Sequence, residues 1–305
     1  MNREFLEALK IPETIRIPFF GGKWYQFLTK LENKSIREET LPENPINTEK
    51  REKKVIATLT TYPGRIGCVH LAIKSIMLQT YKPDRIILWL ADSQFPGRVL
   101  PEELTALEKY GLEILWMHDL HSNKKFFYPV LNQKEDELVI TFDDDIIYST
   151  KTIERLMKTH AEYPDCMICE RAQAYDESNP YQPGRWITIS DKGVNAPSYS
   201  LNPSPGGGCL IPYGLFCEDV CNEEKINTLA HHHDDVWFMF MCVQNNRKIK
   251  KTRKYHKTFS VITDSQTEAI AYDNVQGNSN LGVVQKLSEV YPDAWHRIVT
   301  DTDVK

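Results

Sequence analysis

Three consecutive aspartates stand between two apolar stretches in the segment LVITFDDDIIY, which spans residues 138–148. Adjacent carboxylates repel one another, and each loses hydration when the surrounding chain is buried. A bound divalent cation with oxygen ligands would offset both costs. Because residues i and i+2 of an extended segment point to the same side, we expect Asp143 and Asp145 to bind Mg²⁺ or Mn²⁺ together.

Three kinds of metal chemistry use carboxylates at the end of a hydrophobic strand. A P-loop nucleoside triphosphatase needs a G-x-x-x-x-G-K-[ST] loop, which the sequence lacks. An EF-hand-like calcium loop needs alternating oxygen ligands, a glycine and a distant glutamate, whereas Ile146 and Ile147 follow the triplet directly. The third is sugar transfer from a nucleotide sugar, in which the cation neutralises charge on the leaving diphosphate. In that chemistry Asp144 would contact the ribose or a neighbouring donor group.

A second acidic pair, Asp234 and Asp235, precedes the apolar sequence VWFMF. Acids in the first turn of a helix are stabilised by its dipole, so a capping role is one explanation. The other is that one of the pair is a general base, which takes a proton from an acceptor hydroxyl while its neighbour orients the acceptor.

Two short runs lie close to this pair in the sequence. For the three histidines at 231–233 we favour a structural or acceptor-side role over metal binding, since three adjacent imidazoles cannot all face one ion from a regular backbone. The three glycines at 206–208 either permit close approach of the backbone to a sugar or form a flexible loop.

Strand-like and helix-like segments alternate along the first half of the chain. The segments predicted as strands are 55–62, 85–92, 112–117 and 137–142. Residues 69–77 carry apolar side chains at helical spacing. This alternation predicts an α/β fold with a mostly parallel central sheet flanked by helices, and with ligands at the carboxyl ends of strands. The aspartate triplet lies at such an end.

The alternation fades after about residue 165, although DDVWFMFMCV at 234–243 predicts a buried helix. We therefore divide the chain into an N-terminal extension or linker (1–54), a regular half (55–150) and a more irregular half (151–305). Under the sugar-transfer hypothesis the regular half would bind the nucleotide sugar, and the irregular half would bind the acceptor and end in a closing segment.

The composition, with 41% hydrophobic and 26% charged residues, is that of a globular protein. A net charge of −5 gives no general attraction to nucleic acid, and we interpret the basic run at 248–257 as a solvated face. No signal peptide begins the chain, and no window has the ~18 apolar residues that span a membrane.

The seven cysteines form no regular framework. We interpret CMIC (166–169) and CEDVC (217–221) as ordinary cysteines of a reduced, cytoplasmic protein rather than as a zinc site. A lipid-linked acceptor would bring such a protein to the inner face of the membrane.

Five segments, in their order along the chain, resemble a bacterial family 2 glycosyltransferase with the Rossmann-like GT-A fold. They are VIATLTTYPGRI (55–66), SIMLQTYKPDRIILWLA (75–91), LVITFDDDIIY (138–148), GGGCLIP (206–212) and HHDDVWF (232–238). The similarity covers roughly residues 55–280, and within the family the chain resembles enzymes of capsule and surface-polysaccharide assembly. It implies a hexosyl- or related sugar transferase that moves a sugar from a nucleotide sugar, here a UDP-sugar, to a saccharide or lipid-linked saccharide acceptor with inversion.

The resemblance also implies a nucleotide site on the first strand and its turn, which here means Thr60, Thr61, Tyr62 and Arg65. An acidic residue after the second strand commonly contacts the base or ribose, and Asp92 occupies that place. For Tyr62 and Arg65, a plain turn with a surface charge is an equal alternative.

Further roles follow from the same resemblance. Lys124 or Lys125 could bind the diphosphate, and we assign this role to Lys125. For both side chains we slightly favour an exposed position. The family pattern makes Asp235 the base and Asp234 its acceptor-orienting neighbour. His256 is a candidate third metal ligand from the C-terminal region, and residues 265–280 resemble a loop that closes over the diphosphate.

Two other functions stay open. A sugar nucleotidyltransferase also uses Mg²⁺ and a nucleotide, but the sequence has no basic, glycine-rich phosphate loop after its first strand. A carbohydrate-binding module would explain the glycine run and the six tryptophans, but it gives no reason for the aspartate triplet.

Overall fold

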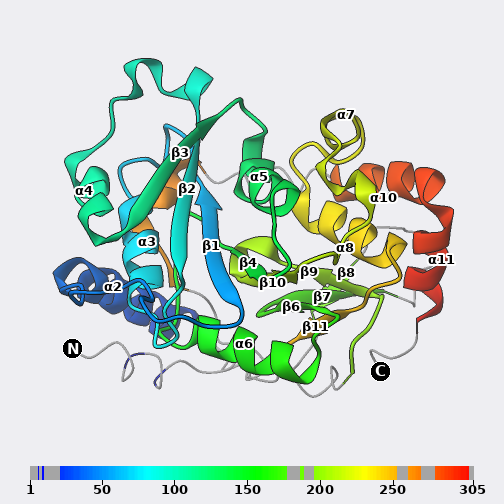
Figure 1. Ribbon diagram of the computed structural model, residues 1–305, viewed down its shortest axis with the longest axis horizontal. Helices are drawn as coiled ribbons and strands as arrows, with labels where there is room; N and C mark the ends of the chain where they lie inside the picture. Colours follow the sequence, from blue (N-terminus) through cyan, green and yellow to red (C-terminus); the bar gives the residue numbers. More distant parts are fainter. Residues whose placement is uncertain are drawn as a thin grey trace.

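The computed structural model describes Leu6, Leu9 and residues 21–176, 186–188, 196–252, 260–268 and 279–301. A twisted central sheet runs through it, with helices against both faces (Figure 1). His256 and residues 269–278 of the expected closing segment lie outside the described residues.

The helices and strands of the described residues have the following bounds. The strands are β1 (Lys54–Thr60), β2 (Arg85–Ala91), β3 (Leu112–Met117), β4 (Glu137–Thr141), β5 (Ile146–Ile147), β6 (Met167–Cys169), β7 (Ala172–Tyr175), β8 (Trp186–Thr188), β9 (Leu201–Pro203), β10 (Cys209–Pro212), β11 (Ile249–Lys251) and β12 (Ser260–Val261). The α-helices are α2 (Gly21–Glu38), α3 (Val69–Met77), α4 (Glu102–Thr105), α5 (Phe127–Leu131), α6 (Thr152–Glu162), α7 (Glu223–Lys225), α8 (Asp234–Gln244), α10 (Ser279–Val290) and α11 (Pro292–Thr300).

The central sheet has seven strands in the order β11-β6-β10-β4-β1-β2-β3. Strand β1 pairs in parallel with β2 and β4, β2 with β3, and β11 with β6, whereas β10 is antiparallel to both of its neighbours. The prediction of an α/β fold with a mostly parallel central sheet is therefore confirmed. A three-stranded sheet β8-β7-β9 and a two-stranded sheet β12-β5 accompany it.

The side chains of β1 alternate between two cores, one on each face of the sheet. Val55, Ala57 and Leu59 pack with helices α3, α4 and α6. Ile56 belongs to the opposite core, which includes residues of α5, α8, α10 and α11. Burial on both faces is why β1, β2 and β4 read as nearly continuous apolar segments.

Most predicted elements of the first half appear within one or two residues of their expected ends. The predicted helix at 69–77 coincides with α3, and the predicted strand at 112–117 coincides with β3. The helix predicted at 234–243 is α8, in which every residue from 236 to 243 is buried.

The expectation of a solvated face at 248–257 is wrong for Lys250 and Lys251. Both are fully buried in β11. The Nζ atom of Lys250 donates to the carbonyl oxygen of Lys251 at 2.8 Å and lies 5.5 Å from the ring centroid of Tyr163. The aliphatic stems of lysine pack like apolar side chains when the ammonium group finds such partners.

Helix α2 packs against the rest of the chain within the segment predicted as an extension. It contacts α3 and β12. The amide of Asn33 donates to the carbonyl oxygen of Val261 at 2.9 Å, and Glu32 accepts a hydrogen bond from the hydroxyl of Ser260. Through these contacts α2 fixes the small sheet in which β5, just after the aspartate triplet, pairs with β12.

All seven cysteines are free. Within the described part of the chain, no helix has the length and apolar character that a membrane crossing requires.

Candidate active site

The aspartate triplet and the turn after β1 meet because two parallel strands end side by side. Strands β1 and β4 pair from Lys54↔Glu137 to Thr58↔Thr141, so both chains leave the sheet at the same edge. There the hydroxyl of Thr61 donates to Asp144 at 2.6 Å, and Nη1 of Arg65 donates to the same carboxylate at 2.8 Å. Asp144 therefore joins the β1 turn to the end of β4.

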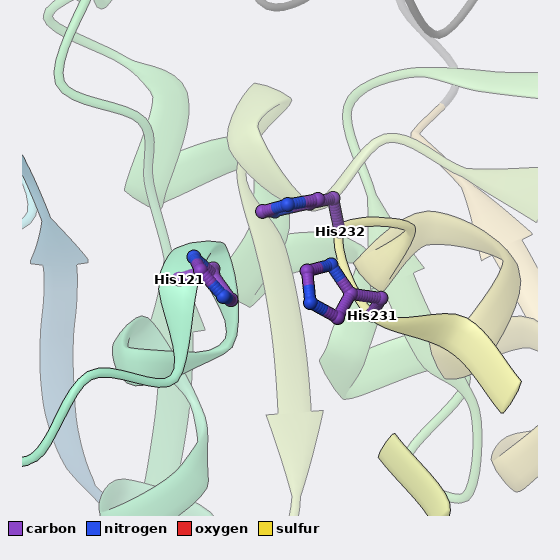
Figure 2. A group of neighbouring side chains, drawn as sticks. All are labelled: His121, His231 and His232. Atoms are coloured by element: carbon purple, nitrogen blue, oxygen red, sulfur yellow. The ribbon is translucent and has the colours of Figure 1, made fainter. Parts of the chain in front are cut away.

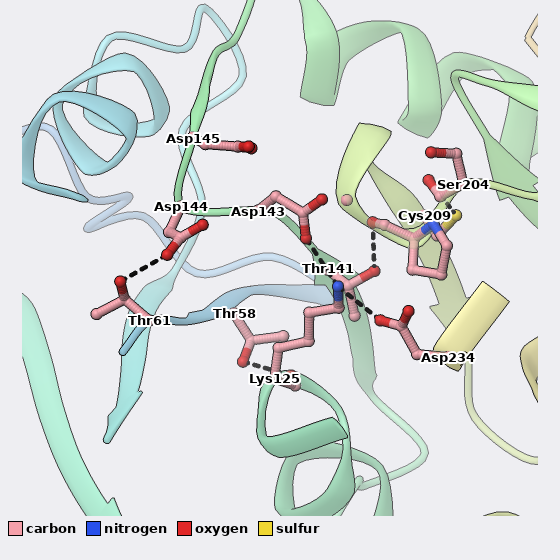
Figure 3. A network of polar contacts seen from close by, with 12 residues as sticks. Thr58, Thr61, Lys125, Thr141, Asp143, Asp144, Asp145, Ser204, Cys209 and Asp234 are labelled. Atoms are coloured by element: carbon pink, nitrogen blue, oxygen red, sulfur yellow. Dashed lines mark hydrogen bonds and ion pairs between the residues drawn. The ribbon is translucent and has the colours of Figure 1, made fainter. Parts of the chain in front are cut away.

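The neighbouring aspartates extend away from Asp144. Figure 3 shows Asp143 and Asp145 on one side of the segment, with Asp144 turned toward Thr61. Asp145 lies 3.1 Å from Nη1 of Arg65, and 37% of the Asp143 side chain is exposed. The alternation expected of an i, i+2 pair is present.

Lys125 is a buried cation between the two acidic motifs. Its Nζ atom lies 2.8 Å from Oδ1 of Asp143 and 2.7 Å from Oδ2 of Asp234 (Figure 3). Burial by itself lowers the pKa of this lysine, but the charges of Asp143 and Asp234 outweigh burial and raise the pKa above its ordinary value. Lys125 is therefore protonated near neutral pH.

The expectation that Lys124 and Lys125 are exposed is wrong, since their side chains are only 2% and 4% accessible. Lys124 is held by Oδ1 of Asp119 at 2.6 Å. Both lysines belong to a short 3₁₀ helix at His121–Lys125, which contacts β1 and in which Asn123, Lys124 and Lys125 are buried. The hydroxyl of Thr58 in β1 donates to the carbonyl oxygen of Lys125 at 2.7 Å.

The acidic end of the site has more negative than positive charge. Four carboxylates face two cations, Arg65 and Lys125, which leaves an excess of two negative charges; the carboxylates are those of Asp143, Asp144, Asp145 and Asp234. Burial, followed by the charge of Asp143, raises the pKa of Asp145 to about 6.

The residues present fit a divalent cation with oxygen ligands. Asp143 and Asp145 reach the same cavity, and a charge of +2 would balance the excess around them. We expect these two carboxylates to hold Mn²⁺ or Mg²⁺ together with oxygens of a bound ligand.

The first glycine of the run at 206–208 makes room for Asp143. A Cβ atom on Gly206 would lie 1.5 Å from Oδ2 of Asp143. All three glycines are buried, and Gly208 has φ +101°, a value that side chains rarely adopt. The glycine run was predicted to let a sugar approach the backbone closely. In the structure the carboxylate of Asp143 makes this close approach, and the buried glycine loop is packed.

The side chains around the ends of β1 and β4 line a cavity of about 380 Å³. The predicted site residues that line it are Thr60, Thr61, Tyr62, Arg65, Lys125, Asp143, Asp144, Asp145 and Asp234. Most residues assigned to the nucleotide or the metal are thus brought together.

Two assigned residues lie apart from this lining. Asp92, after β2, is half-exposed and pairs with Arg98 at 2.6 Å. Asp235 occupies the first turn of α8 beside Asp234 and accepts a hydrogen bond from Nδ2 of Asn202 at 3.3 Å. Burial, and then the charge of Asp234, raises the pKa of Asp235.

The cavity also contains residues that the sequence did not single out. They are Gln94, His121 and Ser122. The lining also includes Lys124 and, from the histidine run at 231–233, His232. Burial lowers the pKa of His121, and burial together with the neighbouring histidines lowers the pKa of His232 to about 4. Both lie in irregular segments that no periodic pattern predicts, although the histidine run itself was visible.

No family model matches the sequence, and no curated protein matches it. Among solved structures, the fold is similar to a mannosyltransferase of Pyrobaculum calidifontis, PcManGT, in complex with GDP-Man and Mn²⁺, at 10% identity and a TM-score of 0.47; the match covers 92% of this chain and 78% of that one. It is also similar to residues 1–349 of S. aureus TarS, at 16% identity and a TM-score of 0.44, over 68% of this chain and 59% of that one.

Proposed function

We propose that the chain is a metal-dependent glycosyltransferase that moves a sugar from a nucleotide-sugar donor to an acceptor hydroxyl. One observation carries this proposal: at the ends of β1 and β4 the cavity holds four carboxylates that face only Arg65 and Lys125, since Lys124, the third lining cation, is paired with Asp119 outside the lining. A pure carbohydrate-binding site would not need this charge.

The donor would occupy the cavity between the β1 turn and the aspartates. Thr60, Thr61 and Tyr62 would face the nucleoside, while Arg65 holds the Asp144 carboxylate in place beside the ribose. Asp92 lies beyond the lining in a pair with Arg98, so its contact with the nucleotide would require that pair to open. We propose a UDP-sugar as the donor and a saccharide or lipid-linked saccharide of surface-polysaccharide synthesis as the acceptor.

A divalent cation bound by Asp143 and Asp145 would act as a Lewis acid for the leaving diphosphate. Lys125 would hold Asp143 in its position and add one positive charge near the same phosphate oxygens. His256 is a further candidate ligand for that ion.

Asp235 is the better candidate for the base. Asp234 is paired with Lys125 at 2.7 Å, whereas burial gives Asp235 a raised pKa and its carboxylate contacts the neutral amide of Asn202. Asp235 lies outside the cavity lining, so its carboxylate would have to turn toward the cavity to reach the acceptor. The acceptor hydroxyl would lose its proton to Asp235 as its oxygen bonds to the anomeric carbon, and the bond from that carbon to the phosphate oxygen would break. A direct displacement of this kind inverts the anomeric configuration.

Thermal denaturation with UDP, GDP and CDP, each with and without Mn²⁺, tests the donor site first. A ligand that binds only the folded state raises Tm by mass action. We expect a rise with UDP that depends on Mn²⁺, and a rise with GDP or CDP alone would correct the donor assignment. No rise with any nucleotide would contradict the proposal.

Product analysis with a nucleotide sugar and a saccharide acceptor then separates the enzyme classes. Release of the nucleoside diphosphate indicates sugar transfer, release of pyrophosphate from a nucleoside triphosphate and a sugar phosphate indicates nucleotidyl transfer, and the anomeric configuration of the product tests inversion.

A further inference from the structure

Three histidines from two distant segments gather at the edge of the cavity. Figure 2 shows the rings of His121, His231 and His232 close together, and one nitrogen of each lies within 4.8 Å of the others. The ring centroids are 4.6 Å apart for His121 and His231, 4.2 Å for His121 and His232, and 4.0 Å for His231 and His232. His121 and His232 line the cavity, and His231 is exposed at its rim.

Unusual backbone conformations bring these rings together. His121 has φ +52° and His231 has φ +43°, both in the left-handed region. Residues other than glycine rarely adopt positive φ angles, and those that do often lie at functional sites. The turn also separates the run of three, because His233 is buried and its Nδ1 atom lies 3.2 Å from the carbonyl oxygen of Ala230.

A direct hydrogen bond ties the two segments. The amide of Asn123 donates to the carbonyl oxygen of His231 at 2.6 Å across 108 residues of sequence. Asn123 is itself buried and belongs to the same 3₁₀ helix as His121. The histidines are therefore held near one another by the backbone as well as by ring packing.

The ligand chemistry of this cluster differs from that of the aspartates. Imidazole nitrogen is a preferred ligand of Zn²⁺ and related transition ions, whereas Mn²⁺ and Mg²⁺ prefer oxygen. In a tetrahedral site with Zn–N bonds of about 2.0–2.1 Å, two ligand nitrogens lie about 3.4 Å apart. The nitrogens of the cluster lie within 4.8 Å of one another, so the rings must approach by at most about 1.4 Å to close the site.

We propose that His121, His231 and His232 form a binding site for Zn²⁺ or a similar transition ion, separate from the carboxylate site of Asp143 and Asp145. The fourth position of a three-histidine site belongs to water or a ligand. The ion would join the segment that carries Lys125 to the turn that precedes Asp234, and so would brace both sides of the cavity. This inference does not depend on the proposed sugar transfer.

The test is a Zn²⁺ titration of the chelator-treated full chain, followed by calorimetry and carried out without a polyhistidine tag. The wild type is compared with the double variant His121→Gln/His232→Gln and with the single variant His231→Gln, whose exposed side chain can be replaced with little risk to the fold. His296→Gln, an exposed histidine of α11, is the matched control. Circular dichroism confirms that each variant is folded, and Co²⁺ absorption reports four-coordinate geometry at the site.

We expect the wild type and His296→Gln to bind one Zn²⁺ ion that the double variant does not bind, and His231→Gln to bind it at least ~10-fold more weakly. The double variant Asp143→Asn/Asp145→Asn should keep this ion. Equal Zn²⁺ binding by the wild type and both histidine variants would overturn the proposal. So would loss of the ion in the aspartate variant with retention in the histidine variants, because the ion would then belong to the carboxylates.

Discussion

The two ends of the cavity use opposite means to present metal-binding side chains. At the carboxylate end the candidate ligands are neighbours in the sequence, they are charged, and buried cations hold them, with Lys125 2.8 Å from Asp143 and Arg65 3.1 Å from Asp145. At the histidine end the candidate ligands come from two segments, and a left-handed turn and a hydrogen bond between backbone and side chain bring them together.

This difference indicates which kind of ion each end of the cavity can bind. Carboxylates with an excess of negative charge attract a hard cation and the phosphate groups that accompany it. Burial lowers the pKa values of His121 and His232, so these two imidazoles are neutral near pH 7, and nitrogen ligands suit a borderline transition ion better than Mn²⁺ or Mg²⁺. The two proposed sites would therefore favour different kinds of ion.

Replacing Asp145 with alanine should cause the largest loss of activity of the substitutions at the two ends of the cavity. The change removes one ligand of the proposed oxygen site, and we expect loss of about 10³-fold or more in kcat/KM, since a catalytic cation contributes several kcal/mol. Steady-state kinetics with Mn²⁺ measure the loss. Asp136→Ala, which removes an exposed carboxylate paired with Lys54, is the control and should change little. Metal-dependent activity that survives in Asp145→Ala would remove Asp145 from the site.

Asp235→Asn should have the next largest effect, about 10²–10³-fold on kcat, because general bases contribute on that scale. The wild-type rate should fall as the pH falls through the pKa of Asp235, since only the carboxylate accepts a proton. Burial raises that pKa, so the decline should begin at a higher pH than for an ordinary aspartate. In Asp235→Asn, measured at saturating Mn²⁺, this decline should disappear.

Asp234→Asn provides the contrast within the same helix turn. It leaves the proposed base and its decline at low pH, but it removes one partner of Lys125. Because the charge of Asp234 helps to raise the pKa of Asp235, the decline should move to lower pH. If Asp234→Asn abolishes the decline and Asp235→Asn preserves it, the two roles are reversed.

The two ends also differ in how far the sequence could predict them. The strands β1 and β4, the triplet and its position at the end of a strand follow from local apolar patterns, and so does the i, i+2 arrangement of Asp143 and Asp145. The proximity of Thr61 to Asp144 follows from parallel pairing of adjacent strands. These features depend on short stretches of chain and on a general rule of sheet topology.

The histidine cluster depends on features that no local pattern contains. The left-handed turn at His231 separates His233 from its neighbours. No sequence motif near His121 predicts that it meets this turn. Burial of Lys124 and Lys125 was missed for the same reason, because it depends on Asp119, Asp143 and Asp234 surrounding an otherwise polar segment. Long-range contacts between irregular segments decide these positions.

Gly206→Ala should produce a smaller change at the carboxylate end. The new Cβ atom would overlap Oδ2 of Asp143, so that side chain must rotate away from its place beside Lys125. We expect the apparent affinity for Mn²⁺ to fall about 10-fold, which corresponds to about 1.4 kcal/mol, while Zn²⁺ binding at the histidines stays unchanged. Gly282→Ala, where a Cβ atom meets nothing within 4 Å, is the control. Unchanged Mn²⁺ affinity in Gly206→Ala would show that Asp143 does not need this position to bind the ion.

Asn123→Ala should have the smallest effect and should act on the histidine end alone. It removes the hydrogen bond to the carbonyl oxygen of His231, which costs about 1 kcal/mol in the free energy of unfolding and is measured by urea denaturation. Because this bond holds the two segments near each other, Zn²⁺ affinity should fall by about 5-fold, the equivalent of the same 1 kcal/mol. Mn²⁺ affinity should not change. Asn132→Ala removes a bond of the same type within one helical turn, to the carbonyl oxygen of Tyr128, and should leave both affinities intact. Equal loss of Mn²⁺ and Zn²⁺ binding in Asn123→Ala would mean that the two ends of the cavity are coupled through this segment and do not bind their ions independently.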